Sequence, residues 1–362
     1  MRKYKHLICG YYGMQNTGDD ALLHACLTHL DVPESQIAVT ARHTQQGTAI
    51  LPPKQRFRGH DRLCLYRAAA QADSLVFGGG STLHSYTDIQ IKNHMFTLAG
   101  DGPHVALGLG VGPFRDHAAH QAARRLLHKL DFIGVRDEAS YDLCRSMGLG
   151  SRLEKTADLV PSLLHDKTLR QRVHTGGTRS GIGVSLCPVE SINGGNTVEE
   201  TQRTLEICRA LEQVYRITGE PIYLIDLNGN EALGDQYLHS SILRALPAHI
   251  PVTRIPYDPN PLRCLQNISR LKCVVAMRLH AQIFAFLTNT PVIAINYHSK
   301  NRGWADLTKA HPSLSINLDD VTSTRLVKTL LAGLKSDFPV PATPLDKVIR
   351  ASSNNWRYLN EG

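Results

Sequence analysis

The apolar run 274–277 ends in Arg278, Leu279 and His280, where a helical pattern begins. A guanidinium is a planar fork of donors that suits a phosphate or a carboxylate, and an imidazole transfers protons near neutral pH. An arginine in so apolar a stretch needs an anionic partner, which is either a carboxylate of the protein or a ligand. A ligand would also meet the N–H groups of the first helical turn. We therefore predict that Arg278 binds an anion and that His280 lies beside it as a candidate proton donor or acceptor.

Two further polar residues, Tyr297 and Lys300, follow the next apolar run, 291–296. Neighbouring parallel strands end at the same edge of a sheet, so both side chains are expected to converge on the anion held by Arg278. An ordinary surface turn is the alternative interpretation.

A glycine-punctuated loop, 10–21, separates the first predicted strand from the first predicted helix. Asp19 and Asp20 at a helix start disfavour a bound anion, so this is a poor phosphate loop. We expect Asn16 and Asp19 to face hydroxyl groups of a ligand, or Asp19 to act as a base. Capping of the helix is the alternative role for these side chains.

Three further motifs lie at predicted strand ends: Gly78-Gly79-Gly80-Ser81, the glycine-rich run 108–113, and Arg136-Asp137. Glycines let the backbone approach a ligand closely, but neither run matches a dinucleotide or P-loop fingerprint. A tight turn explains 108–113 equally well, and an ion pair between two loops would explain Arg136. The candidate acceptor-binding residues are Asn16, Asp19, Gly79, Gly80, Ser81 and Arg136.

Short apolar runs alternate with helical patterns along the whole chain, which is typical of β-α-β units and a mainly parallel sheet. In the first half the predicted strands are 7–12, 37–41, 75–77, 105–109 and 132–135, and the predicted helices are 21–30, 117–130 and 138–147. In the second half the predicted strands are 181–186, 222–227, 252–255, 273–277 and 291–296, and the predicted helices are 199–217, 233–246, 261–269, 281–287 and 325–334. We therefore predict an α/β fold of two doubly wound Rossmann-like domains.

The polar and basic segment 167–180 shows no apolar period and is predicted to be the domain linker. Residues 1–166 would form the N-terminal domain on the acceptor side, and 181–335 the C-terminal domain on the donor side. The segment 336–362 is expected to cross back to the N-terminal domain. Ligands of such folds bind beyond the carboxyl ends of the strands, so a cleft between the domains is the expected site.

The chain has 362 residues, with 42% hydrophobic and 20% charged residues and a formal net charge of +8. These values indicate a globular protein, and the positive charge favours an anionic partner. One stretch combines a single acid, Asp61, with the basic residues Arg42, Lys54, Arg56, Arg58, Arg62 and Arg67. It suits an anionic lipid surface, a nucleic acid or a phosphorylated substrate, or is simply a solvated loop and helix face. The 6% aromatic content and the lack of a reading element argue against nucleic acid.

The eight cysteines are scattered and form no CxxC pair. This pattern predicts reduced thiols in a cytoplasmic protein, with no zinc or other metal site and no cofactor. We see no secretion signal and no apolar run of about 18 residues, so a peripheral contact with the inner membrane is the only membrane attachment left open.

Taken together, the motifs resemble the polysaccharide pyruvyl transferase family. The resemblance runs through the loop 10–21, Gly78-Gly79-Gly80-Ser81, 108–113, Val135-Arg136-Asp137, Ala157-Asp158, Gly183-Val184-Ser185-Leu186, Arg278-Leu279-His280 and Tyr297-His298-Ser299-Lys300. It implies an architecture similar to GT-B glycosyltransferases, with phosphoenolpyruvate as the donor substrate. The product would be a sugar of a polysaccharide or a lipid-linked oligosaccharide that carries pyruvate as a ketal, with phosphate released.

The family resemblance associates the Arg-Leu-His tripeptide with the donor, and this role transfers to Arg278, Leu279 and His280. We expect His280 to act as general acid at the donor and Asp19 to orient or deprotonate the acceptor. One residue departs from the pattern, because Cys187 stands where family members often carry an arginine. Two alternatives share these features: a GT-B glycosyltransferase with a nucleotide-sugar donor, and a non-catalytic protein that binds an anionic glycan.

Overall fold

The computed structural model describes residues 2–44, 47–51, 58–174, 177–232 and 234–360. The chain divides into two units. The N-terminal unit comprises residues 1–14, 19–165 and 346–362, and the C-terminal unit comprises 15–18 and 166–345. Four residues of the early loop therefore belong with the second half of the chain, and the C-terminal segment belongs with the first half.

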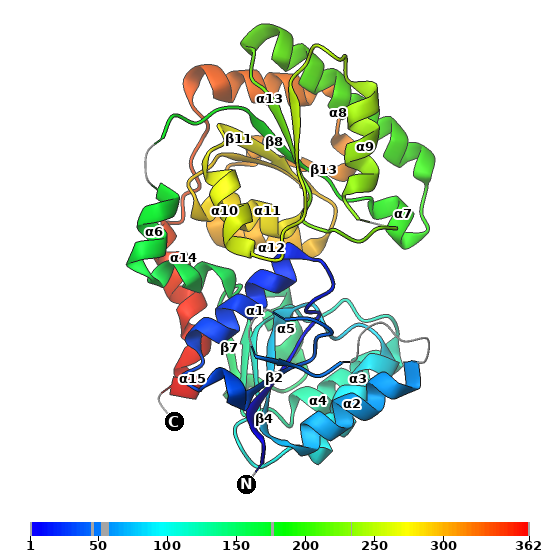
Figure 1. The fold of residues 1–362 in the computed structure, drawn as a ribbon, viewed down its shortest axis with the longest axis vertical. Helices are drawn as coiled ribbons and strands as arrows, with labels where there is room; N and C mark the ends of the chain where they lie inside the picture. The colour runs from blue at the N-terminus through cyan, green and yellow to red at the C-terminus, as the bar shows by residue number, and fades with distance from the viewer. Residues whose placement is uncertain (1, 45–46, 52–57, 175–176, 233, 361–362) are drawn as a thin grey trace. The chain divides into compact units, whose positions relative to one another are not determined.

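A parallel seven-stranded sheet forms the centre of the N-terminal unit, in the order β3-β2-β1-β4-β5-β6-β7. Its strands are β1 (Tyr4–Cys9), β2 (Ile37–Val39), β3 (Thr48–Ala49), β4 (Ala72–Gly80), β5 (Val105–Leu109), β6 (Phe132–Val135) and β7 (Leu153–Lys155). The helices are α1 (Thr17–His29), α2 (Arg58–Ala70), α3 (Tyr86–Leu98), α4 (His117–Leu127), α5 (Glu138–Ser146), α14 (Leu345–Ser353) and α15 (Arg357–Asn360). Helices α2, α3 and α4 cover one face of this sheet, and α1 and α14 lie on the other (Figure 1).

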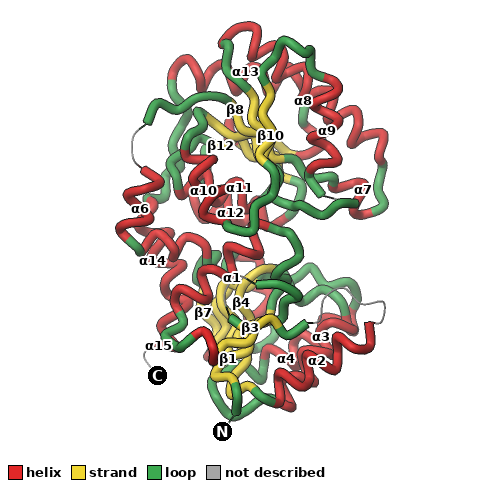
Figure 2. Tube along the Cα trace, viewed as in Figure 1, coloured by secondary structure: helices red, strands yellow, loops and turns green. Residues whose placement is uncertain are grey.

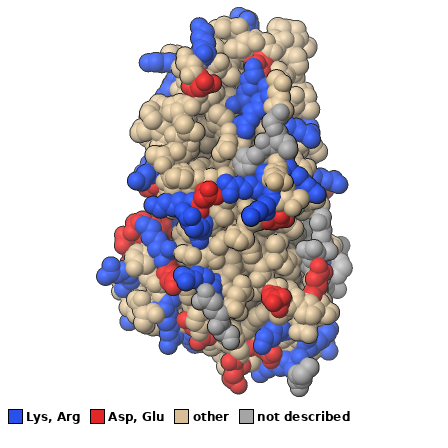
Figure 3. All heavy atoms as spheres, turned by 90° about the vertical axis from the view of Figure 1, so that its left-hand side faces the viewer, with Lys and Arg blue, Asp and Glu red and all other residues tan. Residues whose placement is uncertain are grey.

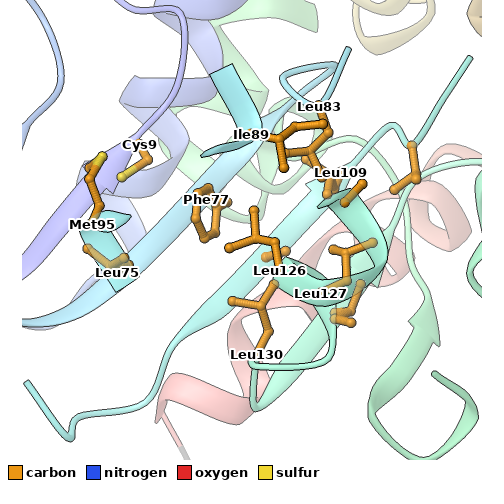
Figure 4. Packing of buried hydrophobic residues seen from close by; sticks show 14 of the residues in the cluster. Cys9, Leu75, Phe77, Leu83, Ile89, Met95, Leu109, Leu126, Leu127 and Leu130 are labelled. Carbon is orange, nitrogen blue, oxygen red and sulfur yellow. The ribbon is translucent and has the colours of Figure 1, made fainter. Parts of the chain in front are cut away.

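Apolar side chains of the N-terminal sheet and its helices form one continuous core. Figure 4 shows Phe77 of β4 beside Ile89 of α3 and Leu126 of α4. Strands covered on both faces read as continuous apolar runs, which is why the sequence pattern located the central strands of this sheet.

The C-terminal unit is built around a parallel six-stranded sheet in the order β10-β9-β8-β11-β12-β13. Its strands are β8 (Ile182–Ser185), β9 (Ile222–Ile225), β10 (Val252–Ile255), β11 (Cys273–Ala276), β12 (Val292–Asn296) and β13 (Ser315–Asn317). The helices are α6 (Lys167–His174), α7 (Val189–Asn193), α8 (Thr197–Thr218), α9 (Gln236–Ala245), α10 (Pro261–Ser269), α11 (Leu279–Leu287), α12 (Ser299–Thr308) and α13 (Ser323–Ser336). Helices α8, α9 and α13 lie on one face of the sheet and α10, α11 and α12 on the other, as the strands and helices of Figure 2 show.

Two parallel sheets with interleaved helices confirm the predicted α/β fold with two Rossmann-like domains. The predicted linker, however, begins with helix α6. Asp166 initiates this helix, because its Oδ1 accepts the N–H of Thr168 at 2.7 Å, and Val173 of the helix is buried. The segment is helical although it lacks an apolar period, because an aspartate cap precedes residues of high helix propensity. Thr175 and Gly176 of the predicted linker lie outside the described residues.

Candidate functional site

The predicted donor residues lie together in the C-terminal unit. Strand β11 pairs in parallel with β8 on one side and β12 on the other, so residues that follow these strands share one edge of the sheet. The side chains of Cys187 and Tyr297 form a hydrogen bond, and both interact electrostatically with Arg278. Lys300 Nζ lies 5.8 Å from the centroid of the Tyr297 ring. The structure thus brings Arg278, Tyr297 and Lys300 together, which leaves their function as a prediction.

Two helices begin at this edge and add positive potential. Helix α11 begins directly after Arg278, and α12 begins after His298, whose Nδ1 accepts the N–H of Lys300 at 3.3 Å. The first N–H groups of a helix have no partner within the helix, and its amino end carries partial positive charge. The edge is therefore suited to an anion.

The Arg278 guanidinium has an anionic partner within the protein. Its Nε donates to Asp235 Oδ1 at 2.9 Å, and Nη2 donates to the same oxygen. Asp235 is completely buried, whereas 14% of the Arg278 side chain is exposed. Burial disfavours the charged guanidinium, but the neighbouring Asp235 keeps the pKa of Arg278 above its usual value. Of the two anionic partners expected for Arg278, a protein carboxylate or a ligand, the protein supplies the carboxylate.

The pairing with Asp235 changes the argument for an anionic ligand. One carboxylate neutralises the charge of Arg278, so this arginine does not by itself require a bound anion. Nη1 of Arg278 makes no hydrogen bond within the described part of the chain, which leaves one arm of the fork as a donor. Anion binding at this edge would therefore depend on that arm together with Lys300 and the two helix ends.

Cys187, the departure from the family pattern, presents a neutral group. Burial raises the pKa of the Cys187 thiol, and the opposing effect of Arg278 is smaller. The thiol is therefore protonated at neutral pH and adds no charge where an arginine was expected. Lys300 interacts electrostatically with Cys187 and remains the candidate substitute.

His280 packs directly against Gly18. A Cβ atom at position 18 would lie 2.0 Å from the Nδ1 atom of His280, so only glycine fits there. Gly18 belongs to the four-residue segment 15–18 of the C-terminal unit. Thr17 of this segment donates its N–H to the carbonyl of Leu227 at 2.8 Å. A loop far away in sequence thus supplies the surface on which the His280 ring rests.

Several buried oxygen atoms of the C-terminal unit have no hydrogen-bond partner within the described residues: Thr17 Oγ1, Ser185 Oγ, Asn296 Oδ1 and Asn301 Oδ1. Ser185 is the last residue of β8, and Asn301 lies in the first turn of α12, where its Nδ2 donates to Met277 at 2.8 Å. Buried polar atoms are almost always hydrogen-bonded, so such atoms point to water or a polar ligand at this edge. None of these four residues was among the predicted catalytic, donor-binding or acceptor-binding residues.

The glycine turn of the N-terminal unit is shaped by a buried tyrosine. Tyr12 donates its hydroxyl to the carbonyl of Gly78 at 2.7 Å, and a Cβ at Gly78 would lie 2.3 Å from that hydroxyl. Gly79 and Gly80 both have positive φ angles, 82° and 77°, which other residues rarely adopt. Asp19 lies beside this turn, because its Oδ1 would be 3.6 Å from a Cβ at Gly80.

Arg136 is a structural residue in the N-terminal unit. Its Nη1 donates to Asp158 at 3.0 Å and its Nη2 to Ser81 Oγ at 3.0 Å, and the residue is buried. Asp137 lies farther from Arg136, at 3.9 Å, and caps α5 instead. The ion-pair interpretation of Arg136 therefore holds, with Asp158 as the partner in place of Asp137. A role of Arg136 in ligand binding stays a prediction.

Asn16 lies in the C-terminal unit, although the sequence placed it on the acceptor side. Its Oδ1 accepts the N–H of Gly18 at 3.0 Å, and its backbone forms an antiparallel bridge with Asn228. This is the capping role that the sequence analysis left as the alternative. This backbone bridge explains why residues 15–18 belong to the C-terminal unit, whereas the residues on either side of them in the chain belong to the N-terminal unit.

The basic stretch is partly neutralised. Arg42 forms a two-point hydrogen bond with Asp61, whereas Arg62 and Arg67 on α2 are exposed. Lys54 and Arg56, and the side chain of Arg58, lie outside the described residues. On the face shown in Figure 3, Lys and Arg side chains are interspersed with Asp and Glu, so the net positive charge is not gathered into one uninterrupted patch there.

All eight cysteines are described, and none forms a disulfide. No group of three or more His, Cys, Asp or Glu side chains in the described ranges could hold a metal ion. Among the described helices, none has the length and apolar character needed to cross a bilayer.

Comparison with known proteins identifies the family. The polysaccharide pyruvyl transferase family model matches residues 16–299, whereas no curated protein matches the sequence significantly. A Listeria monocytogenes protein assigned as a UDP-N-acetylglucosamine 2-epimerase aligns with 10% identity over 100% of this chain and 98% of its own, with a TM-score of 0.65. The UDP-GlcNAc 2-epimerase of Methanocaldococcus jannaschii aligns with 12% identity over 99% of both chains, with a TM-score of 0.63. The Neisseria meningitidis enzyme, solved bound to UDP-GlcNAc, aligns with 10% identity over 99% of both chains, also with a TM-score of 0.63.

These structures share the GT-B-like fold of this chain, and at such low identity the likeness concerns the fold alone. The family match covers most of the sequence. The chain therefore belongs to the polysaccharide pyruvyl transferase family.

Proposed function

We propose that this protein transfers the pyruvyl group of phosphoenolpyruvate to a sugar of a polysaccharide or a lipid-linked oligosaccharide. Two hydroxyl oxygens of the sugar form bonds to the donor carbon that carried the phosphate, and the methylene group of the donor becomes a methyl group. The products are a pyruvate ketal and free phosphate. The family match supports a transferase that acts on a polysaccharide. The donor and the product are inferences from the chemistry of the site.

One observation carries the proposal: cationic and N–H-rich groups converge at the carboxyl ends of β11 and β12. Phosphoenolpyruvate has a phosphate and a carboxylate, so its site needs two such groups. Arg278 Nη1 with the amino end of α11 would hold one anionic group, and Lys300 with the amino end of α12 the other. The unpartnered oxygens of Ser185 and Asn301 suit the bound water that such a polar ligand brings.

The reaction requires one proton at the donor carbon. We assign its delivery to His280: the imidazolium protonates the methylene carbon, and the first sugar hydroxyl attacks the cation-like centre while Asp19 takes its proton. Proton exchange with solvent then returns that proton to His280. The second hydroxyl then displaces phosphate, which leaves with the second proton. One C–H bond, two C–O bonds and one O–H bond of the released phosphate form, while two hydroxyl O–H bonds, the C–O bond to phosphate and the C=C π bond break, so the atoms balance.

Asp19 would orient or deprotonate the acceptor. It follows Gly18 directly in the chain and lies beside the Gly79-Gly80 turn of the N-terminal unit. A carboxylate accepts hydrogen bonds from sugar hydroxyls, and Ser81 adds a hydroxyl that is already oriented by Arg136.

A nucleotide-sugar glycosyltransferase is the second candidate function. Its support is the likeness in fold to epimerases, one of which was solved with UDP-GlcNAc. Ligand-dependent melting separates the two, because a ligand that binds the native state raises the melting temperature. We expect phosphoenolpyruvate to raise it and UDP- or GDP-sugars to leave it unchanged. The reverse result would favour the glycosyltransferase.

The role of His280 can be tested by substitution. Replacing His280 by Ala should lower turnover by about 100-fold or more, the usual scale for an acid-base residue. His249 is an exposed histidine of the same unit, and H249A serves as the matched control. Turnover in H280A equal to that in H249A would remove His280 from the mechanism.

A lipid-diphosphate-linked acceptor would place the enzyme at the cytoplasmic face of the inner membrane. Basic residues close to a membrane surface contribute about 1 kcal/mol each to binding an anionic leaflet. Charge reversal at Arg56, Arg58 and Arg62 should therefore reduce cosedimentation of the protein with anionic vesicles. The control reverses three exposed arginines elsewhere, Arg209, Arg216 and Arg263. Equal losses in both triple variants would indicate a general charge effect and no docking surface.

A further inference from the structure

Asp235 occupies the position before α9 where an aspartate normally caps the helix, but its side chain makes no capping hydrogen bond. Instead, Oδ2 accepts the N–H groups of Leu227 and Asn228 at 2.9 and 3.0 Å, while Oδ1 accepts from Arg278. An aspartate at this position usually stabilises its own helix by accepting a backbone N–H of the first turn. The Asp235 side chain does not cap α9 and instead binds Arg278 and the backbone at 227–228.

The backbone that Asp235 holds also holds the segment 15–18. The carbonyl of Leu227 accepts the N–H of Thr17 at 2.8 Å, and the N–H of Gly229 donates to the carbonyl of Gln15 at 2.8 Å. The Asn16–Asn228 bridge lies between these two hydrogen bonds. Asp235 therefore contacts the segment 15–18 indirectly, through the backbone of residues 227–229.

Gly18 in turn contacts the ring of His280, and Arg278 and His280 are two residues apart at the start of α11. One buried carboxylate is thus connected to both donor-site residues, to Arg278 directly and to His280 by way of the segment 15–18. Because Asp235 occupies Nε and Nη2 of Arg278, it also determines that Nη1 is the arm left for a ligand.

We propose that Asp235 is a positioning residue of the donor site, which orients the Arg278 guanidinium and holds the segment 15–18 against His280. This inference rests on the proposed function for its catalytic consequence, whereas the structural connection stands apart from the identity of the donor.

The variant D235N tests the proposal with little change in volume. An amide has one acceptor oxygen in place of two, so it cannot serve both Arg278 and the two backbone N–H groups. Its N–H₂ group must face one set of donors. The variant also leaves the Arg278 charge without compensation, which favours binding of an anion while the guanidinium is no longer oriented.

Two readouts follow. We expect kcat for phosphate release from phosphoenolpyruvate to fall about 10- to 100-fold, since a misplacement of about 1 Å can lower a rate 100-fold, while KM for phosphoenolpyruvate stays equal or decreases. Amide hydrogen exchange at Thr17 and Gly229 should become at least 10-fold faster relative to the other amides of the C-terminal unit. Neither amide touches Asp235, so this local increase reports the connection itself.

The matched control is E200Q. Glu200 is another buried carboxylate of the same unit that accepts a backbone N–H, from Glu190 at 2.9 Å. Its replacement should lower the melting temperature without changing exchange at Thr17 and Gly229. The double variant D235N/R278Q removes the uncompensated charge, and we expect it to recover thermal stability over D235N without recovering kcat.

A D235N protein with unchanged kcat, or with exchange at Thr17 and Gly229 no faster than in E200Q, overturns the proposal. Recovery of kcat together with stability in D235N/R278Q also overturns it, because that result describes a merely structural carboxylate. If the wild-type protein has no activity with phosphoenolpyruvate while D235N still accelerates the two amides, the connection stands and the proposed donor is what fails.

Discussion

Replacing Gly18 by Ala tests whether the placement of the His280 ring matters for the reaction. The new Cβ would lie 2.0 Å from Nδ1, 2.5 Å from Cγ and 2.7 Å from Cε1 of His280. Carbon atoms pack at about 3.5 Å or more, so the ring must move by roughly 1.5 Å. The backbone at Gly18 lies outside the left-handed region, so alanine adds no backbone strain and the effect comes from this contact.

We expect G18A to lower stability by about 1–3 kcal/mol, the usual effect of overpacking a well-packed site. A displacement above 1 Å should lower kcat by about 100-fold. Phosphate release from phosphoenolpyruvate measures the rate, and thermal unfolding measures the stability. The double variant G18A/H280A removes the clashing ring, so it should regain the stability lost in G18A while staying as slow as H280A.

The control substitution is G150A, because a Cβ at Gly150 meets no atom within 4 Å. A G18A enzyme that is as stable and as active as G150A would refute the contact, its importance for catalysis, or both. A double variant no more stable than G18A would show that His280 is not what the new methyl group meets.

Two further predictions concern stability. Burial lowers the pKa of His6 from 6.5 to about 4, so the unfolded chain binds a proton below pH 6.5 that the folded protein refuses, and stability is lost as the pH falls. His6 should account for about 2 kcal/mol of the free energy of unfolding that is lost between pH 7 and pH 5. In denaturant unfolding, the H6N variant should therefore lose about 2 kcal/mol less than the wild type over this range. The control variant H84N, at an exposed histidine, should lose as much as the wild type. Asn355 is buried and accepts hydrogen bonds from Gly108 N at 2.7 Å and Thr156 Oγ1 at 2.8 Å, so N355A should lower the free energy of unfolding by about 3 kcal/mol or more because it leaves buried polar groups unpaired. The neighbouring N354A is its control, and equal losses in the two variants would contradict this reasoning.

Buried parallel strands were the part of the fold that the sequence predicted best. Strands β5 and β6 begin and end at the predicted residues, because runs that are apolar and buried along their whole length leave little choice of position. The edge strand β10 also begins and ends as predicted, although none of its residues is fully buried. Helix α3 was missed, since only Ile89 and Met95 of its residues are buried and so few positions give no clear period. The short edge strands β3 and β7 were missed for the same reason.

The clustering of Arg278 and Tyr297 could be predicted because strand order and chemistry agree at the carboxyl ends of β11 and β12. Arg278 and Tyr297 follow strands that are both apolar and neighbouring, and parallel pairing then requires them to meet. Asp235 could not be found in this way, because it lies after a loop and before a helix, with nothing in its surroundings to suggest a buried carboxylate. The membership of Gln15–Gly18 in the C-terminal unit depends on backbone hydrogen bonds to Leu227 and Gly229, which no side-chain pattern encodes.

The central claim is that phosphoenolpyruvate is the donor and a sugar diol the acceptor. In the most direct test, the purified protein is incubated with phosphoenolpyruvate and a panel of lipid-linked or synthetic galactosides, glucosides and mannosaminides. The masses of the products are then measured by mass spectrometry. We predict that one acceptor gains the mass of pyruvate less one water, with one phosphate released for each ketal formed. Unmodified acceptors throughout the panel, together with glycosyl transfer from a UDP- or GDP-sugar to one of them, would contradict the claim.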